Sequence, residues 1–134
     1  ENIMTTGASG KGIGNIQDLV KLDDKVLVCA VIQHHVTGQV LMVGSMNREA
    51  LDSTLRERTA CFWSRSRQKL WLKGETSGNF LRVTEVRTDC DADALLVKCD
   101  PSGPTCHTNE TSCFYRKVDA DGAVYLAGDG VAEN

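Results

Sequence analysis

Several features are missing from this sequence of 134 residues, and each absence argues against a class of protein. No run approaches the roughly 18 consecutive apolar residues of a membrane-spanning helix. Residues 1–15 lack the apolar core of a secretory signal, and the formal net charge of -3 argues against general binding to nucleic acid or to a membrane surface. The sequence therefore indicates one domain that can bury its own core.

The pattern of apolar residues predicts an α+β domain of mostly short strands with one central amphipathic helix. We expect this helix over residues 48–57, because Asn47 is a favourable N-cap and apolar residues follow at helical spacing. A short helical entry is expected over residues 16–22. The expected strands cover residues 25–33, 39–43, 60–64, 69–73, 80–88, 94–99, 112–118 and 123–126, with a tight turn at 119–122. The domain is expected over residues 16–127, between a flexible lead-in (1–15) and a frayed end (128–134).

Six cysteines require an explanation, and they divide into two sets. Three of them lie in apolar runs and are interpreted as small core residues: Cys29, Cys61 and Cys99. The other three are candidate metal ligands, because no secretory signal favours a disulfide scaffold: Cys90, Cys106 and Cys113. Three thiolates without an obvious fourth protein ligand leave an open position, as a catalytic zinc ion requires. Spacing alone leaves three buried thiols as an equal alternative.

A histidine, His107, directly follows one of these candidate ligands, Cys106. Neighbouring side chains of an extended segment point to opposite sides. His107 therefore suits a general acid/base better than a fourth zinc ligand, although it could instead complete the tetrahedron.

Carboxylates cluster in one short segment, at Asp89, Asp91 and Asp93. If the segment is extended, all three point to one face, and a hard cation such as Mg²⁺ relieves their mutual repulsion. A solvated acidic turn is the alternative. A calcium-binding loop does not fit, because Ala94 stands where such a loop needs glycine and Asp100 stands where it needs glutamate.

Cations alternate with hydroxyl groups over residues 63–71, between two tryptophans. Guanidinium and ammonium groups suit phosphate oxygens, and an indole face can stack on a base. The glycine-bounded loop that follows, residues 74–78, is either a ligand loop or a simple turn. The candidate substrate-binding residues are Trp63, Ser64, Arg65, Ser66, Arg67, Lys69, Lys73, Glu75, Thr76 and Ser77. An ordinary hairpin with solvated charges is the alternative.

Taken together, these segments resemble the phosphoribosyl-AMP cyclohydrolases of histidine biosynthesis. The resemblance lies in six stretches that occur in the order of that family: residues 46–51, 62–67, 73–78, 89–94, 106–108 and 112–115. A chain of motifs between residues 25 and 117 is far more specific than any single cluster.

The resemblance implies a zinc-dependent hydrolase that cleaves the N1–C6 bond of the adenine ring of phosphoribosyl-AMP. The product is the ring-opened formimino-carboxamide ribotide. The resemblance also implies an interlocked homodimer, in which Cys90 of one chain and Cys106 with Cys113 of the other hold the zinc ion. The magnesium ligands would be Asp89, Asp91 and Asp93. The resemblance further implies a location in the cytoplasm, or in the plastid stroma if the source is a plant or alga.

Two departures from the family pattern are small. Gly44-Ser45 stands where many relatives carry a bulkier pair, which is expected to reshape a pocket wall. Asn109 stands where they often have glycine, and asparagine tolerates a left-handed backbone. The alternative function is a non-catalytic dimeric module with a structural zinc ion on the three cysteines. The acidic triad, His107 and the arginine-rich turn would have no task in such a closed site.

Overall fold

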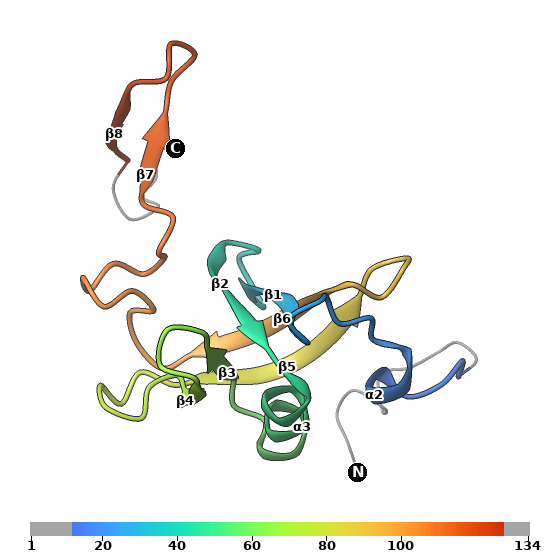
Figure 1. Cartoon of the computed structure of the whole chain (residues 1–134). Helices are drawn as coiled ribbons and strands as arrows, with labels where there is room; N and C mark the ends of the chain where they lie inside the picture. The colour runs from blue at the N-terminus through green and yellow to red at the C-terminus, as the bar shows by residue number, and fades with distance from the viewer. Residues whose placement is uncertain (1–11, 128–134) are drawn as a thin grey trace.

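The computed structural model describes residues 12–127, which adopt an α+β architecture made mostly of strands (Figure 1). The described helices are α2 (Ile16–Leu19) and α3 (Arg48–Glu57). The described strands are β1 (Val28–His34), β2 (Val40–Met46), β3 (Cys61–Ser64), β4 (Lys69–Leu72), β5 (Leu81–Thr88), β6 (Ala94–Pro101), β7 (Arg116–Val118) and β8 (Val124–Leu126). The predicted α+β class of mostly short strands is confirmed, and this part of the chain has two helices where the prediction stressed one. The expected frayed end (128–134) and most of the expected lead-in (1–15) lie outside the described residues.

The main sheet has the strand order β2-β1-β6-β5, in which β1 and β6 are parallel and the other neighbours are antiparallel. One face of this sheet carries the core, because Ala30 and Ile32 of β1 belong to the same buried cluster as Leu51 of α3 and Phe62 of β3. Helix α3 and the hairpin β3–β4 therefore cover one face. Neither helix of the described chain is long and apolar enough to cross a membrane.

Helix α3 begins and ends where the sequence predicted. The Asn47 side chain accepts a hydrogen bond from the Ala50 amide at 2.9 Å, which satisfies a free donor of the first turn. Thr54 is buried, and its hydroxyl donates to the Ala50 carbonyl at 2.8 Å and accepts from the Cys61 amide at 2.9 Å. This one hydroxyl ties the helix to the start of β3.

The predicted first strand, residues 25–33, is wrong at its beginning, because β1 starts only at Val28. The preceding residues form a turn closed by Asp23, whose carboxylate accepts hydrogen bonds from the amides of Lys25 at 2.9 Å and Leu27 at 3.0 Å. A side chain that bonds to its own backbone two residues on competes with the strand ladder.

The predicted strand over residues 112–118 is also wrong in its first half, since β7 begins at Arg116. The residues before it are bound to the edge strand β2 instead. The Ser112 hydroxyl donates to the Val40 carbonyl at 2.6 Å, and the Cys113 amide donates to the Leu41 carbonyl at 2.8 Å. These bonds fix Cys113 against β2 of its own chain.

Two of the three cysteines assigned to the core are buried, namely Cys61 and Cys99, but Cys29 is exposed. The prediction for Cys29 is wrong because side chains alternate along a strand. Val28 and Ala30 face the core, so Cys29 between them faces the other side of the sheet.

Strands β7 and β8 form a hairpin that projects from the body of the molecule (Figure 1). All six of its strand residues are exposed. The predicted tight turn at residues 119–122 is confirmed: the Asp119 carboxylate accepts from the amides of Asp121 and Ala123, both at 2.9 Å. We call residues 116–126 the arm.

Candidate active site

A cavity of about 230 Å³ joins two segments that are far apart in the sequence. One wall is the loop that follows β4, and the other is the segment that carries Cys106 and His107. The lining residues are Trp71, Lys73, Gly74, Glu75, Thr76, Ser77, Asn79, Pro104, Thr105, Cys106, His107 and Asn109. The structure thus brings four of the predicted substrate-binding residues to the predicted general acid/base.

The loop after β4 owes its shape to Gly74. This residue has a φ of +96°, and an added Cβ would lie 2.7 Å from the backbone of Asn79 and Phe80. The Gly74 carbonyl accepts a hydrogen bond from the Gly78 amide at 2.7 Å, which closes the loop. Only glycine permits both the conformation and the close approach.

Two of the predicted zinc ligands, Cys106 and Cys113, lie in contact, and the Cys113 thiol donates a hydrogen bond to the Cys106 sulfur. Cys106 is buried, and its sulfur accepts a hydrogen bond from the Thr108 hydroxyl at 3.0 Å. The turn between them is closed by the Asn109 amide, which donates to the Cys106 carbonyl at 2.9 Å. Asn109 has a φ of 74°, so this residue adopts the left-handed backbone that asparagine tolerates.

The two thiols differ in acidity. Burial opposes ionisation of Cys106, but hydrogen bonds from Thr108 and Cys113 outweigh it and lower its pKa. Desolvation and the adjacent Cys106 raise the pKa of Cys113 to about 11. The Lys73 ammonium favours ionisation of both sulfurs. Without a cation, the pair therefore carries one thiolate more readily than two, and a divalent metal ion would stabilise the second.

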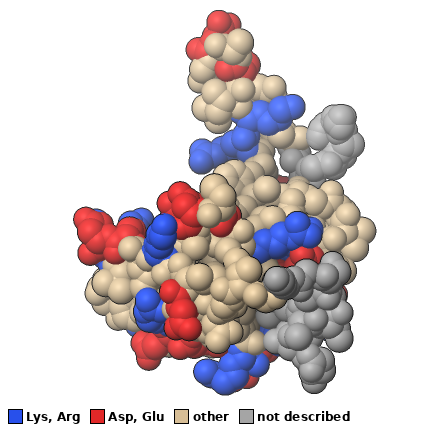
Figure 2. Space-filling view, turned by 90° about the vertical axis from the view of Figure 1, so that its right-hand side faces the viewer, with Lys and Arg blue, Asp and Glu red and all other residues tan. Residues whose placement is uncertain are grey.

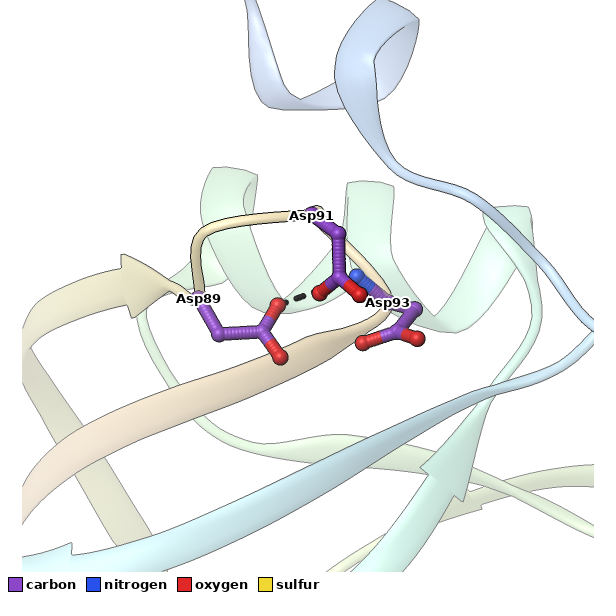
Figure 3. Close-up of side chains that lie close together, drawn as sticks. All are labelled: Asp89, Asp91 and Asp93. Carbon is purple, nitrogen blue, oxygen red and sulfur yellow. Dashed lines mark hydrogen bonds between the residues drawn. The ribbon is translucent and has the colours of Figure 1, made fainter.

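The three predicted magnesium ligands converge in the turn between β5 and β6 (Figure 3). One carboxylate oxygen from each of Asp89, Asp91 and Asp93 lies within 4.8 Å of the others. The segment is a turn and not the extended form considered from the sequence, and Ala92 in it adopts a left-handed φ of 59°. The Asp89 carboxylate also accepts from the Asp93 amide at 3.0 Å, which holds the turn closed.

These carboxylates do not ionise independently. Hydrogen bonding to Asp91 and Asp89 raises the pKa of Asp93. Desolvation opposes ionisation of Asp89, but hydrogen bonds from Asp93 and from the Ala94 amide lower its pKa. Three exposed carboxylates at this separation retain a proton more readily than separate ones, and a bound hard cation would replace that proton.

The third predicted zinc ligand, Cys90, lies in the acidic turn and is exposed. Cys113 is bound to β2, whereas this turn joins β5 and β6 on the other side of the sheet. Strand spacing and residue rise place the two thiols at opposite corners, on the order of 20 Å apart. Among the described residues, the group of side chains placed to hold a metal ion is the aspartate triad, and the three cysteines form no such group within one chain.

The arginine-rich segment forms the turn of the hairpin β3–β4, where Ser64 pairs with Lys69. The Ser64 hydroxyl accepts from the Arg67 amide at 3.2 Å, which shapes the turn. A second cavity of about 310 Å³ lies between this turn and β2, and its lining residues are Val43, Gly44, Ser45, Phe62, Trp63, Ser64, Arg65, Ser66, Arg67 and Trp71. Lys69 is exposed on β4 and is in the lining of neither cavity.

Comparison with known proteins identifies the family. The model of the family described as phosphoribosyl-AMP cyclohydrolase matches residues 42–115. A phosphoribosyl-AMP cyclohydrolase of Chlorobium phaeovibrioides is 52% identical over 109 residues, which cover 81% of this chain and 80% of that protein. One of Rhizorhabdus wittichii is 55% identical over 102 residues, covering 76% and 82% of the two chains. The chain belongs to the phosphoribosyl-AMP cyclohydrolase family. It is therefore an enzyme of a hydrolase family, and the resemblance drawn from the motifs is confirmed.

Within this cyclohydrolase fold, Trp71 is a residue that the sequence-based site assignment missed. It lines both cavities, and the Lys73 ammonium lies 5.5 Å from the centre of its ring. The ring of Phe62 packs against it at 5.5 Å. Two other missed residues of the first cavity are Asn79 and Thr105. Trp71 could have been inferred from its pairing opposite Phe62 in the β3–β4 hairpin, whereas Thr105 carries no sequence signal of its own.

Proposed function

We propose that this chain hydrolyses the N1–C6 bond of the adenine ring of phosphoribosyl-AMP, opening the purine to the formimino-carboxamide ribotide in histidine biosynthesis. The observation that carries the proposal is the first cavity, where His107 and Cys106 face the loop of Lys73 and Thr76 in a member of the cyclohydrolase family. In this hydrolysis, water contributes oxygen to C6 and a proton to N1.

The donor set fits a zinc ion, because Cys106 and Cys113 already lie in contact and thiolates are favoured zinc ligands. The third thiolate, Cys90, cannot reach them within one chain. We therefore propose a homodimer in which each zinc ion takes Cys90 from one protomer and Cys106 with Cys113 from its partner. A zinc ion with three thiolate ligands and an open position supplies an activated water near neutral pH.

Residues of this chain would transfer the proton and bind the substrate. His107 lines the cavity beside Cys106, where its imidazole can carry the proton that N1 gains as the ring opens. Trp71, at the junction of both cavities, places an aromatic surface between the thiols and the arginine-rich turn. Arg65 and Arg67 line the second cavity and are assigned to the substrate phosphates. Four further residues are assigned to the phosphates or the closing loop: Ser64, Ser66, Lys69 and Ser77.

The acidic triad is assigned to Mg²⁺, which would bind a substrate phosphate or orient the substrate. Three converging carboxylate oxygens suit a hard cation better than the softer zinc ion, for which the cysteine thiolates are the stronger ligands. The alternative function, a non-catalytic module with a structural zinc ion, is not favoured. A non-catalytic module would not explain why the chain belongs to a hydrolase family, nor why polar side chains line both cavities.

The proposal is tested by an absorbance assay with phosphoribosyl-AMP on the purified protein, after chelation, and after Zn²⁺ is restored with Mg²⁺ present. We expect turnover that disappears on chelation and returns with zinc. A folded, dimeric, zinc-loaded protein without turnover would sink the enzymatic proposal for this chain.

A pair of variants tests whether His107 acts as a general acid/base or as a zinc ligand. His107→Ala is expected to lower turnover while the protein keeps its zinc content. The matched control is His35→Ala, which removes a partly exposed histidine at the end of β1, outside both cavities, and should keep activity. Loss of zinc from His107→Ala would make His107 a ligand instead.

A further inference from the structure

We propose that Thr108 is a positioning residue, whose hydroxyl holds the Cys106 sulfur in the place of a zinc ligand. The inference rests on the proposed zinc site, and it adds a side chain that contacts a ligand and not the metal ion. Its basis is a hydrogen bond, in which the Thr108 hydroxyl donates to the Cys106 sulfur at 3.0 Å. Outer partners of this kind orient metal ligands and adjust their charge.

A tight turn over residues 106–109, in the segment between β6 and β7, brings the two groups together (Figure 1). The Asn109 amide donates to the Cys106 carbonyl at 2.9 Å, and the Cys106 amide donates to the Glu110 carbonyl at 3.1 Å. In turns of this kind, an aspartate or asparagine at the first position accepts a hydrogen bond from the residue two positions on. Here the Cys106 sulfur takes that place, and Thr108 offers it both a hydroxyl and an amide.

The Cys106 sulfur is an acceptor, unlike the sulfurs of the two buried core cysteines. Cys61 and Cys99 donate to backbone carbonyls at 4.0 and 3.9 Å, as neutral thiols do. A neutral thiol is a weak acceptor, whereas a hydrogen bond to an ionised group is roughly twice as strong as one between neutral groups. The bond from Thr108 is therefore strongest when Cys106 is ionised, as it is in a zinc site.

The donor from Thr108 remains when a metal ion binds. The Cys113 thiol also donates to the Cys106 sulfur, but that proton is lost when both cysteines are zinc ligands. Three thiolates more than neutralise a divalent zinc ion, and a hydroxyl that donates to one sulfur withdraws part of that charge. The Thr108 hydroxyl thus fixes the direction of the sulfur and offsets some of its charge in the loaded site.

The Thr108 side chain does not belong to the first cavity. Its neighbours on both sides, His107 and Asn109, line that cavity, whereas Thr108 does not. The hydroxyl is therefore placed to act through Cys106 and not on a bound substrate. For this reason the role of Thr108 is measured through the metal site, without substrate.

Zinc affinity of the dimeric full chain tests this role. Thr108→Val keeps the shape of the side chain and removes the hydroxyl, so the zinc dissociation constant should rise roughly 10- to 100-fold, measured by competition with a chromogenic chelator. Thr108→Ser keeps the hydroxyl and should bind zinc nearly as the parent chain does. The matched control is Thr105→Val, on the other side of Cys106. The Thr105 hydroxyl is buried without a hydrogen-bond partner among the described residues, so its removal should leave zinc affinity unchanged.

Cobalt(II) in place of zinc separates the hydrogen bond from a general structural effect. At saturating Co²⁺, the thiolate-to-cobalt charge-transfer band of Thr108→Val should move to lower energy, because a sulfur without the hydrogen bond gives up an electron more easily. A loosened local structure would weaken binding without moving the band of the saturated protein.

Several outcomes would overturn the inference. These are equal zinc dissociation constants in Thr108→Val and Thr108→Ser, an equal rise in Thr105→Val, an unmoved cobalt band, and a parent chain that binds neither metal. A parent chain that shows the expected metal binding but does not hydrolyse phosphoribosyl-AMP would retain the role of Thr108 and reject only the proposed hydrolysis.

Discussion

The chain contains two small hairpins of similar local pattern, of which one is packed against the body and the other is exposed. In β3–β4, Cys61 and Phe62 are 4% and 1% exposed, because the hairpin packs under the main sheet beside α3. In β7–β8, every strand residue is exposed. The difference shows that a strand-turn-strand pattern predicts a hairpin but does not predict which surface will cover it.

The covered hairpin has its partner in the same chain. Gly44 of β2 leaves room for the Phe62 ring, since an added Cβ would lie 2.5 Å from that ring. The Thr54 hydroxyl then joins the hairpin to α3. The strand residues of the arm have no such burying contact with the body among residues 12–127, and Figure 2 shows the arm standing clear of the body.

The largest effect is expected from Phe62→Ala in the covered hairpin. Removing a fully buried ring should lower the free energy of unfolding by about 3–5 kcal/mol, because a cavity remains. Urea denaturation measures it, with Val118→Ala of the arm as the control. At concentrations where the chain is monomeric, the control should change stability by less than about 0.5 kcal/mol. Equal losses in both variants would erase the contrast between the hairpins.

Alanine substitutions at two glycines with positive φ extend the comparison between the arm and the body of the molecule. In Gly122→Ala, in the turn of the arm, the added Cβ meets open space. The only cost is that of holding alanine in a left-handed backbone, roughly 1–2 kcal/mol, and it should affect the stability of the arm alone. Gly74→Ala also clashes with the backbone of Asn79 at 2.7 Å, so it should destabilise more and lower turnover. Urea denaturation and the cyclohydrolase assay measure the two effects. Full activity in Gly74→Ala would show that the loop tolerates a different shape.

A smaller effect is expected from Thr54, which joins the covered hairpin to the helix. Thr54→Val keeps the shape but leaves the buried Cys61 amide without its acceptor, which should cost about 1–3 kcal/mol. Thr54→Ser retains the hydroxyl and serves as the control, and it should lose less. Thermal unfolding of the two variants decides the matter, and an equal shift in both would assign the loss to the methyl group.

The smallest effect concerns the turn that precedes β1. Hydrogen bonds from the Leu27 and Lys25 amides lower the pKa of Asp23 from its ordinary 3.8. A lowered pKa in the folded chain contributes stability above that value, and the contribution is lost as the pH falls through the folded pKa. The stability difference between the parent and Asp23→Asn should therefore shrink below about pH 4, measured by urea denaturation at a series of pH values. A difference that stays constant with pH would contradict this.

Interactions between near neighbours made parts of this protein predictable. Asn47 capped the helix over residues 48–57 as expected, since its partner is three residues away. The tight turn of the arm followed from Asp119 and Gly122. The aspartates converged although their segment is a turn, because five consecutive residues cannot place these side chains far apart.

Predictions that depended on distant partners were the ones that changed. Cys29 lies in an apolar run, yet its side chain is exposed, because the described residues cover only the opposite face of its sheet. Residues 112–115 have strand-like composition, yet bonds to β2 draw Ser112 and Cys113 out of the arm. Neither partner is near in the sequence, so no local pattern contains the information.

The sequence by itself determined the fold class, the family and the residue types of the site, because these depend on periodicity and on motifs that are read in order. Only the tertiary structure decided that the Cys106–His107 segment and the loop of Lys73 share one cavity, and that Cys90 lies at the opposite corner of the sheet. The physical reason is that strand order and the choice of covered face arise from packing between residues far apart in the chain, where side-chain shape and burial outweigh local preference.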